Sequence, residues 1–172
     1  MLSTTRDLFR HMAWADAKMW HSVLATSTAE NDAALRQKVC HIHSVQRGYL
    51  AIWRGGAPEW RDASTFTDLH SLAVYGREYH DDVAGFLATL DEPSLDQTAP
   101  LPWAGRLTEV IGVQPADTTL RDTLLQVATH SLYHRGQVNA RLRELGSEPP
   151  LVDYIAWIWI GRPTPEWPSF RG

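Results

Sequence analysis

The stretch His130-Ser131-Leu132-Tyr133-His134-Arg135-Gly136-Gln137 decides the fold of this chain, because its two histidines stand four residues apart within a long amphipathic pattern. At about 100° per residue, His134 lies at about 40° from His130, and an apolar stripe lies at about 60° to 120°; it consists of Leu120, Leu124, Val127, Val138, Leu142 and Leu145. Residues i and i+4 share one face of a helix, so both imidazoles border the buried stripe. The pattern predicts a long helix from just after 117–119 to Gly146.

Two neighbouring imidazoles beside an apolar stripe have two explanations. Each ring finds its own hydrogen bond in the core, or one cation binds both rings together with a ligand from another helix. We favour the cation, because it satisfies both rings at once. Position 131 is Ser, so the adjacent general base of the helical metalloprotease motif is absent. The chain also lacks the repeated Glu-x-x-His pairs of di-iron carboxylate bundles, which excludes that class.

Helix-period patterns cover most of the remaining chain. Apolar spacings of three and four predict a first helix over about residues 5–25, a second over about 30–53 and a third from about 67 to 90. Residues 93–117, with a β-friendly patch at 107–113, predict a long crossover with at most a hairpin. A short apolar helix is expected over 153–160. The sequence therefore predicts one all-α domain over residues 1–172: a four-helix bundle with a long crossover before the fourth helix and a short C-terminal fifth helix.

Composition excludes several classes of partner. A net charge of −4 leaves no basic surface for nucleic acid. Cys40 is the only cysteine, so no internal disulfide forms, and we expect a small buried residue in a reducing cytoplasm. The N-terminus has no signal-peptide pattern and no 18-residue apolar run occurs, so we expect a soluble protein without a membrane partner. Three tryptophans in predicted loops are candidates to line a pocket or to contribute to an interface: Trp60, Trp103 and Trp167.

The second helix offers two candidates for a third metal ligand. His41 and His43 flank its buried face at about 100° to either side, so periodicity does not choose between them. We expect one to bind and the other to lie at the surface or support the site. The histidines elsewhere form no second close pair and are expected to be exposed or singly hydrogen-bonded: His11, His21, His70 and His80.

Several landmarks resemble the DinB/YfiT-like family of metal-dependent helical bundles. The run Thr129 to Gln137 is followed by Leu142-Arg-Glu-Leu-Gly146 and by Pro149-Pro-Leu-Val-Asp153-Tyr, and Met12-Ala-Trp14-Ala-Asp16 resembles the family's first-helix signature. The family's second helix carries a histidine followed by an aromatic residue and then a glycine. His41 with Tyr49 and Gly55 matches that register, whereas His43 places alanines at both positions.

The resemblance implies one divalent metal, zinc or nickel, bound by His41, His130 and His134 with an open position toward a pocket. Related families use such a site to activate a low-molecular-weight thiol or water in S-transferase, lyase, isomerase or hydrolase-like reactions. The alternative is a non-catalytic, stress-related dimer that sequesters a metal or small molecule. Gln137 is expected either to hydrogen-bond the substrate or a metal-bound water, or to be a polar residue at the helix rim. A homodimer is expected from the family and from residues 154–160, which are hydrophobic nearly all round.

Overall fold

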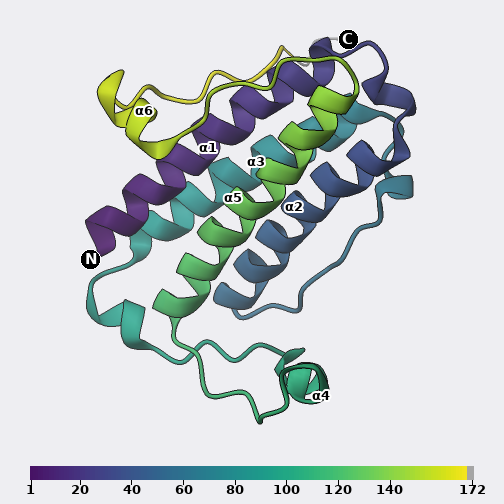
Figure 1. Ribbon diagram of the computed structural model, residues 1–172. Helices are drawn as coiled ribbons and strands as arrows, with labels where there is room; N and C mark the ends of the chain where they lie inside the picture. The colour runs from purple at the N-terminus through teal and green to yellow at the C-terminus, as the bar shows by residue number, and fades with distance from the viewer. Residues whose placement is uncertain (170–172) are drawn as a thin grey trace.

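The computed structural model describes residues 1–169, and its regular elements are all helical, as the sequence predicts. Four long helices form an elongated bundle (Figure 1): α1 (Leu2–Ala25), α2 (Ala33–Trp53), α3 (Leu69–Thr89) and α5 (Leu120–Glu144). Neighbouring helices pack in the cyclic order α1, α3, α2, α5. The α2–α5 side of the bundle is therefore opposite the α1–α3 side. Residues 170–172 of the predicted single domain lie outside the described residues.

Three of the long helices, α2, α3 and α5, begin at side-chain caps that satisfy backbone N–H groups of their first turns. Asp32 accepts a hydrogen bond from the Leu35 N–H at the start of α2. Asp68 with Ser71, and Thr119 with Asp122, form capping boxes at the starts of α3 and α5. The second helix was predicted to begin near Glu30. The structure instead has a short 3₁₀ turn, η1 (Ala29–Asn31), before the Asp32 cap.

The crossover between α3 and α5 projects from one end of the bundle (Figure 1). It contains η3 (Pro93–Asp96), η4 (Ala104–Leu107) and α4 (Thr108–Ile111). Residues 107–111 of the β-friendly patch are thus helical, so the crossover is confirmed and the hairpin that the sequence allowed at most does not form there. Valine and isoleucine favour a strand when a neighbouring strand covers them; here Val110 and Val113 are exposed. Pairing in the described crossover is limited to an isolated bridge between Thr98 and Thr119.

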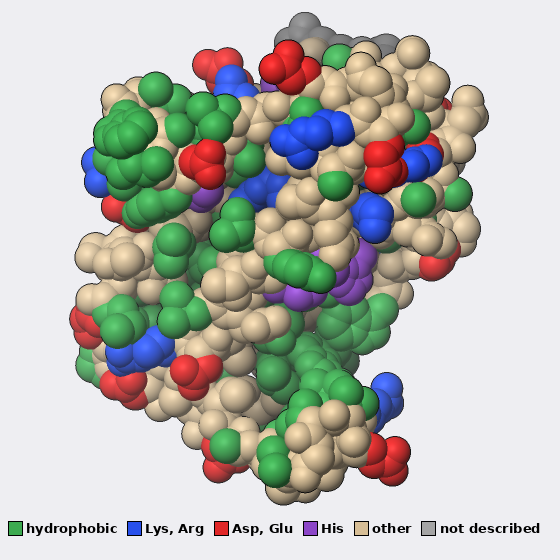
Figure 2. All heavy atoms as spheres, in the orientation of Figure 1, with side chains coloured by type: hydrophobic (Ala, Val, Ile, Leu, Met, Phe, Trp, Pro, Cys, Tyr) green, Lys and Arg blue, Asp and Glu red, His purple; other side chains and the backbone are tan. Residues whose placement is uncertain are grey.

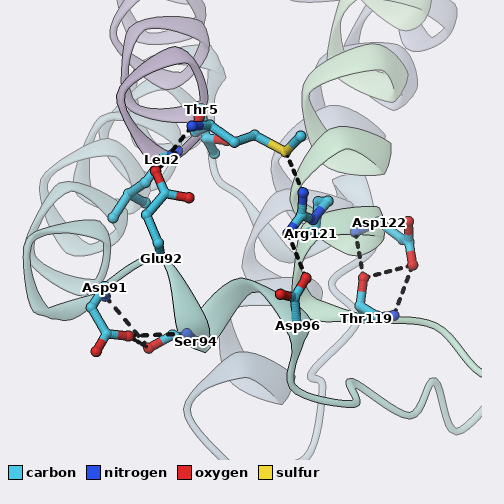
Figure 3. A network of polar contacts seen from close by, with 10 residues as sticks. Leu2, Thr5, Asp91, Glu92, Ser94, Asp96, Thr119, Arg121 and Asp122 are labelled. Carbon is cyan, nitrogen blue, oxygen red and sulfur yellow. Dashed lines mark hydrogen bonds and ion pairs between the residues drawn. The ribbon is translucent and has the colours of Figure 1, made fainter.

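Polar contacts join the crossover to the start of α1 (Figure 3). The Glu92 carboxylate accepts hydrogen bonds from the Met1 ammonium at 2.9 Å and from the Leu2 N–H at 2.8 Å. Arg121, in the first turn of α5, pairs with Asp96 of η3. A carboxylate at a helix N-terminus also interacts favourably with the helix dipole. These contacts place the beginnings of α1 and α5 at the same end of the bundle.

The core runs the length of the bundle and extends beneath the C-terminal helix. One hydrophobic cluster surrounds Trp20 and Leu72, and a second surrounds Met12 and Leu124. The short helix α6 (Tyr154–Trp159) packs Trp157 against α1. Among the described residues, none of the helices combines the length and apolar composition needed to cross a bilayer.

Gly76 of α3 lies where the helix approaches the buried ring of His43. A Cβ atom at position 76 would stand 2.5 Å from His43 Nε2 and 2.6 Å from its Cε1. Hydrogen bonds to Trp20 and Gln46 hold that ring, so it has little freedom to move away. The close approach therefore requires glycine at this position.

We expect Gly76→Ala to destabilise the protein by about 1–3 kcal/mol, the usual cost of overpacking a core. Gly85→Ala is the matched control on the same helix, because a Cβ there meets nothing within 4 Å. We expect it to stabilise by about 0.5–1 kcal/mol through helix propensity. Urea unfolding measures both changes, and equal effects at the two positions would contradict the packing described here.

Candidate metal centre

Three histidines from two neighbouring helices meet on the α2–α5 side of the bundle. His41 of α2 and His130 and His134 of α5 each offer a ligand atom, and these atoms lie within 4.8 Å of one another. The Nε2 atoms of His41 and His130 are 3.3 Å apart. The ring of His134 lies 4.5 Å from that of His41 and 4.3 Å from that of His130. Nitrogens about 2.0–2.1 Å from a tetrahedral metal are about 3.3 Å apart, so this donor set fits a divalent transition metal.

The structure places His41, and not His43, beside the two histidines of α5. His43 is fully buried, and both of its ring nitrogens have partners. Nδ1 donates to Gln46 Oε1 at 2.7 Å, and Nε2 accepts from the Trp20 indole N–H at 2.9 Å. His43 thus supports the core between α1 and α2. The register taken from the family resemblance selects the histidine that lies in the cluster, and its ligation of a metal stays a prediction.

Gln137 orients one of the three rings. Its side-chain carbonyl lies 3.0 Å from His134 Nδ1 and accepts the hydrogen of that nitrogen. In this tautomer Nε2 of His134 carries the lone pair that a metal requires. This contact is a third role for Gln137, beside the substrate contact and the rim position that the sequence suggested. His130 differs, because its buried Nδ1 has no hydrogen-bond partner among the described residues.

The surroundings of His41 and His130 favour the neutral form of these two rings. Burial lowers the pKa of His130 to about 4, and the neighbouring His134 and His41 rings act in the same direction. Burial, followed by the proximity of His134, also lowers the pKa of His41. An uncharged imidazole is the form that ligates metals. The two rings are therefore in the binding form at neutral pH.

A cleft of about 460 Å³ opens beside His41. Cys40 and Ser44 of α2 line one wall, and Trp60 and Arg61 of the segment between α2 and α3 line the other. The Trp60 ring packs on the backbone of α2 at Gly48, where a Cβ would stand 2.7 Å from it. Histidine side chains gather near the centre of the face shown in Figure 2, beside a hollow with hydrophobic walls. The cleft thus gives small molecules access to His41, the α2 member of the cluster.

Trp167 and Cys40 take the roles expected of them, since Trp167 lines a separate cavity between α1 and α3. Trp103 instead packs against Trp60, with ring centroids 5.3 Å apart, and against the core. Cys40 is buried, and its thiol donates to the Arg61 carbonyl at 3.3 Å. Burial raises the pKa of Cys40, which disfavours the nucleophilic thiolate. It is a structural residue in the cleft wall.

A buried polar network lies behind the cluster and touches all four long helices. Asp16 of α1 forms an ion pair with Arg135 of α5, and both side chains are almost completely buried. His80 of α3 donates to Asp16 at 3.0 Å. Gln46 of α2 donates both to Asp16 at 3.0 Å and to Ser131 at 3.1 Å. Arg135 and Ser131 each adjoin one of the α5 histidines in sequence.

The charge state of Asp16 follows from its partners. Burial by itself would raise the pKa of Asp16, but the Arg135 guanidinium and the hydrogen bond from His80 hold that pKa well below its ordinary value. The network therefore contains a carboxylate and a guanidinium that neutralise each other. Arg135 and Ser131 are held in this network, while His130 and His134 of the same helix lie beside His41 of α2.

The sequence interpretation missed this network, although a signal for it was present. Asp16 falls on the same face as Met12 and Met19, both fully buried. Arg135 falls at about 140° from His130, next to the edge of the apolar stripe. A charged residue on each of two buried faces suggests an ion pair between the helices. The other histidines agree with expectation: His11 and His80 are buried with one partner each, whereas His21 and His70 are exposed.

Comparison with family models relates this fold and site to known proteins. Residues 1–166 match the model of the DinB family, so the chain belongs to that family. The match covers all four long helices, the short α6 helix and the three clustered histidines. Comparison with curated proteins and with solved structures gave no match.

We expect Asp16→Ala to destabilise the protein by about 3–5 kcal/mol, because it leaves the buried Arg135 cation without an anion. Asp96→Ala provides the control, since it breaks an exposed pair with Arg121. Such a pair contributes about 0–1 kcal/mol. Chemical denaturation followed by tryptophan fluorescence gives both values. A cost below 1 kcal/mol for Asp16→Ala would contradict the importance assigned to the buried pair.

Proposed function

We propose that this protein is a metal-dependent enzyme that uses His41, His130 and His134 to hold one zinc or nickel ion. The observation that carries the proposal is the convergence of the three rings beside an open cleft. Three neutral nitrogens from two helices form the donor set of a catalytic rather than a closed structural site. A metal held in this way lowers the pKa of a thiol or water and so supplies a nucleophile at neutral pH. The class of reaction is S-transfer, or a related lyase, isomerase or hydrolytic reaction.

The chain's own groups prepare this site in three ways. Gln137 fixes the tautomer and orientation of His134. Burial keeps His41 and His130 uncharged. The Asp16–Arg135 pair holds α5 in the rotation that presents both of its histidines to α2. The ligands are therefore ordered before a metal binds, which reduces the cost of assembling the site.

The cleft suggests how a low-molecular-weight thiol would bind. Arg61 lines it and forms no ion pair with any carboxylate in residues 1–169. Its guanidinium lies over the Tyr75 ring at 5.0 Å, which limits its motion. Trp60, 54% exposed, adds an aromatic wall. A guanidinium and an aromatic ring together suit a small thiol that carries a carboxylate and an apolar electrophile that reacts with it.

Metal content of four alanine variants tests the ligand set. We expect His41→Ala, His130→Ala and His134→Ala to lose most of the bound metal, because each removes one of three ligands. His43→Ala should retain it, because His43 belongs to the buried network. The measurement is elemental analysis of protein purified without a histidine tag. Retention in His41→Ala with loss in His43→Ala would show that the other histidine of α2 is the ligand.

The same proteins then test the activity. We expect the metal-loaded wild type to consume a small thiol in the presence of an electrophile, and each ligand variant to lose that turnover. His70→Ala, an exposed histidine on α3, is the matched control and should keep both metal and activity. Stoichiometric metal without turnover in a panel of thiols would instead favour a non-catalytic, stress-related protein that sequesters a metal or small molecule.

We further propose that the protein forms a homodimer through α6. Its Trp157 is buried, whereas Ile155, Trp159 and Ile160 are 49%, 77% and 62% exposed. Leu151 just before the helix is 69% exposed. Exposed apolar groups so close together are typical of an interaction surface.

Sedimentation should show a dimer that Trp159→Lys converts to a monomer, because a charge in an apolar interface is not solvated. Trp60→Lys, which changes an exposed tryptophan far from α6 in sequence, should leave the dimer intact. A wild type that stays monomeric at every concentration would contradict the proposal.

A further inference from the structure

A cavity of about 750 Å³ lies on the α1–α3 side of the bundle, opposite the histidine cluster. Its volume falls in the range of small-molecule sites, about 300–1,000 Å³. Two helices and the chain that follows α6 enclose it. It shares no lining residue with the cluster or with the cleft beside His41. The cavity is therefore a second site, separate from the proposed metal centre.

Three arginines converge at one end of this cavity. Arg6 and Arg10 lie one turn apart on the same face of α1. Arg162 reaches this end from the C-terminal segment: its Nε lies 3.8 Å from the Asp7 carboxylate, and Arg10 Nη1 lies 3.4 Å from the same carboxylate. One carboxylate thus faces two guanidiniums. This end carries an excess of positive charge.

Arg6 contributes a cation that has no anion of its own. Its Nε and Nη2 atoms donate to the carbonyls of Leu87 and Leu90 at the end of α3. No carboxylate in residues 1–169 pairs with it, and Nη1 has no hydrogen bond within that range. The carbonyls hold the half-buried guanidinium in place and leave its charge available to an anion.

The rest of the cavity is largely apolar. Phe9 and Ala13 of α1 and Ala84 of α3 form its walls, and Trp157 and Trp167 of the C-terminal segment cover it. Arg6 and Ala13 are seven residues apart, so the apolar part extends about 10 Å from the cations. A molecule that fits this space has an anionic group at one end and an aromatic or aliphatic body of similar length.

The far end is closed by His80, with Asp81 beside it in the lining. His80 Nε2 donates to the Asp16 carboxylate, and the buried Nδ1 has no partner among the described residues. The ring of Trp167 lies 5.4 Å away. Among the described lining residues, Asp81 is the only one with a carboxylate, so an anionic ligand is oriented with its charge toward the arginines.

The backbone conformation of Arg162 is a further indication that its side chain serves a ligand in this cavity. Its φ of 54° is the only positive value for a non-glycine residue in the described chain. A left-handed conformation costs an ordinary residue about 1–2 kcal/mol. The Arg162 N–H donates to the Trp157 carbonyl at 2.8 Å and so holds this conformation. Strain of this kind is common where a side chain serves a ligand, and here it brings a guanidinium to the cavity.

We propose that this cavity binds a small organic carboxylate with an apolar, preferably aromatic, body. Arg6, Arg10 and Arg162 receive the carboxylate, and the body lies along α1 beneath Trp157 and Trp167. The site needs no metal, because guanidinium groups supply its positive charge.

Calorimetric titration of the full chain with 3-phenylpropionate tests the proposal. We expect saturable binding of the carboxylate, and binding about 10-fold or more weaker for the uncharged 3-phenylpropionamide, because charge-assisted hydrogen bonds are lost. Chelator-treated protein should bind the probe as the metal-loaded protein does. Equal affinity for acid and amide would overturn the proposal.

Substitutions in and outside the cavity test where 3-phenylpropionate binds. Arg10→Gln and Arg162→Gln should each weaken binding about 10-fold, whereas Arg143→Gln, an exposed arginine at the end of α5, should not. Ala84→Trp fills the cavity from an exposed helix position and should abolish binding without loss of fold, which circular dichroism verifies. His130→Ala should bind normally. Unchanged affinity in a folded Ala84→Trp, or loss in His130→Ala, would place the probe elsewhere and overturn the assignment.

Discussion

The buried ion pair between Asp16 and Arg135 is the interaction on which the arrangement of this bundle depends. It joins α1 to α5, and His80 and Gln46 extend it to α3 and α2. A buried pair contributes little net stability against an apolar alternative, but leaving either charge without its partner is costly. The pair therefore selects one rotation of each helix. Apolar packing alone would tolerate several such rotations with similar area buried.

The two sides of the bundle have different chemistry because the network occupies the space between them. On the α2–α5 side, three imidazole side chains gather beside a cleft with an aromatic wall. On the α1–α3 side, guanidinium groups stand above apolar walls. The network ends at His80 on the α1–α3 side and at Ser131 on the α2–α5 side. The polar interior thus separates a site that suits a metal from one that suits an organic anion.

Helix positions were predictable from the sequence because they depend on neighbouring residues. Apolar periodicity located all four long helices, and the structure shows Asp68 and Thr119 as the caps of α3 and α5. The crossover was less predictable. Its valine and isoleucine residues have β propensity, but propensity produces a strand only when a partner strand is present, and at 107–111 the chain forms helical turns.

The sequence by itself determined that His130 and His134 share one helix face, because a spacing of four residues is a property of the helix alone. Helical periodicity left His41 and His43 equivalent, and a match to family landmarks favoured the first. Only the tertiary structure showed why: Trp20 and Gln46 occupy both nitrogens of His43, while His41 faces α5. The cavity beneath Trp167 and the Asp16–Arg135 pair were likewise decided by packing. Residues more than a hundred positions apart meet only when helices assemble, and no local pattern encodes which faces come together.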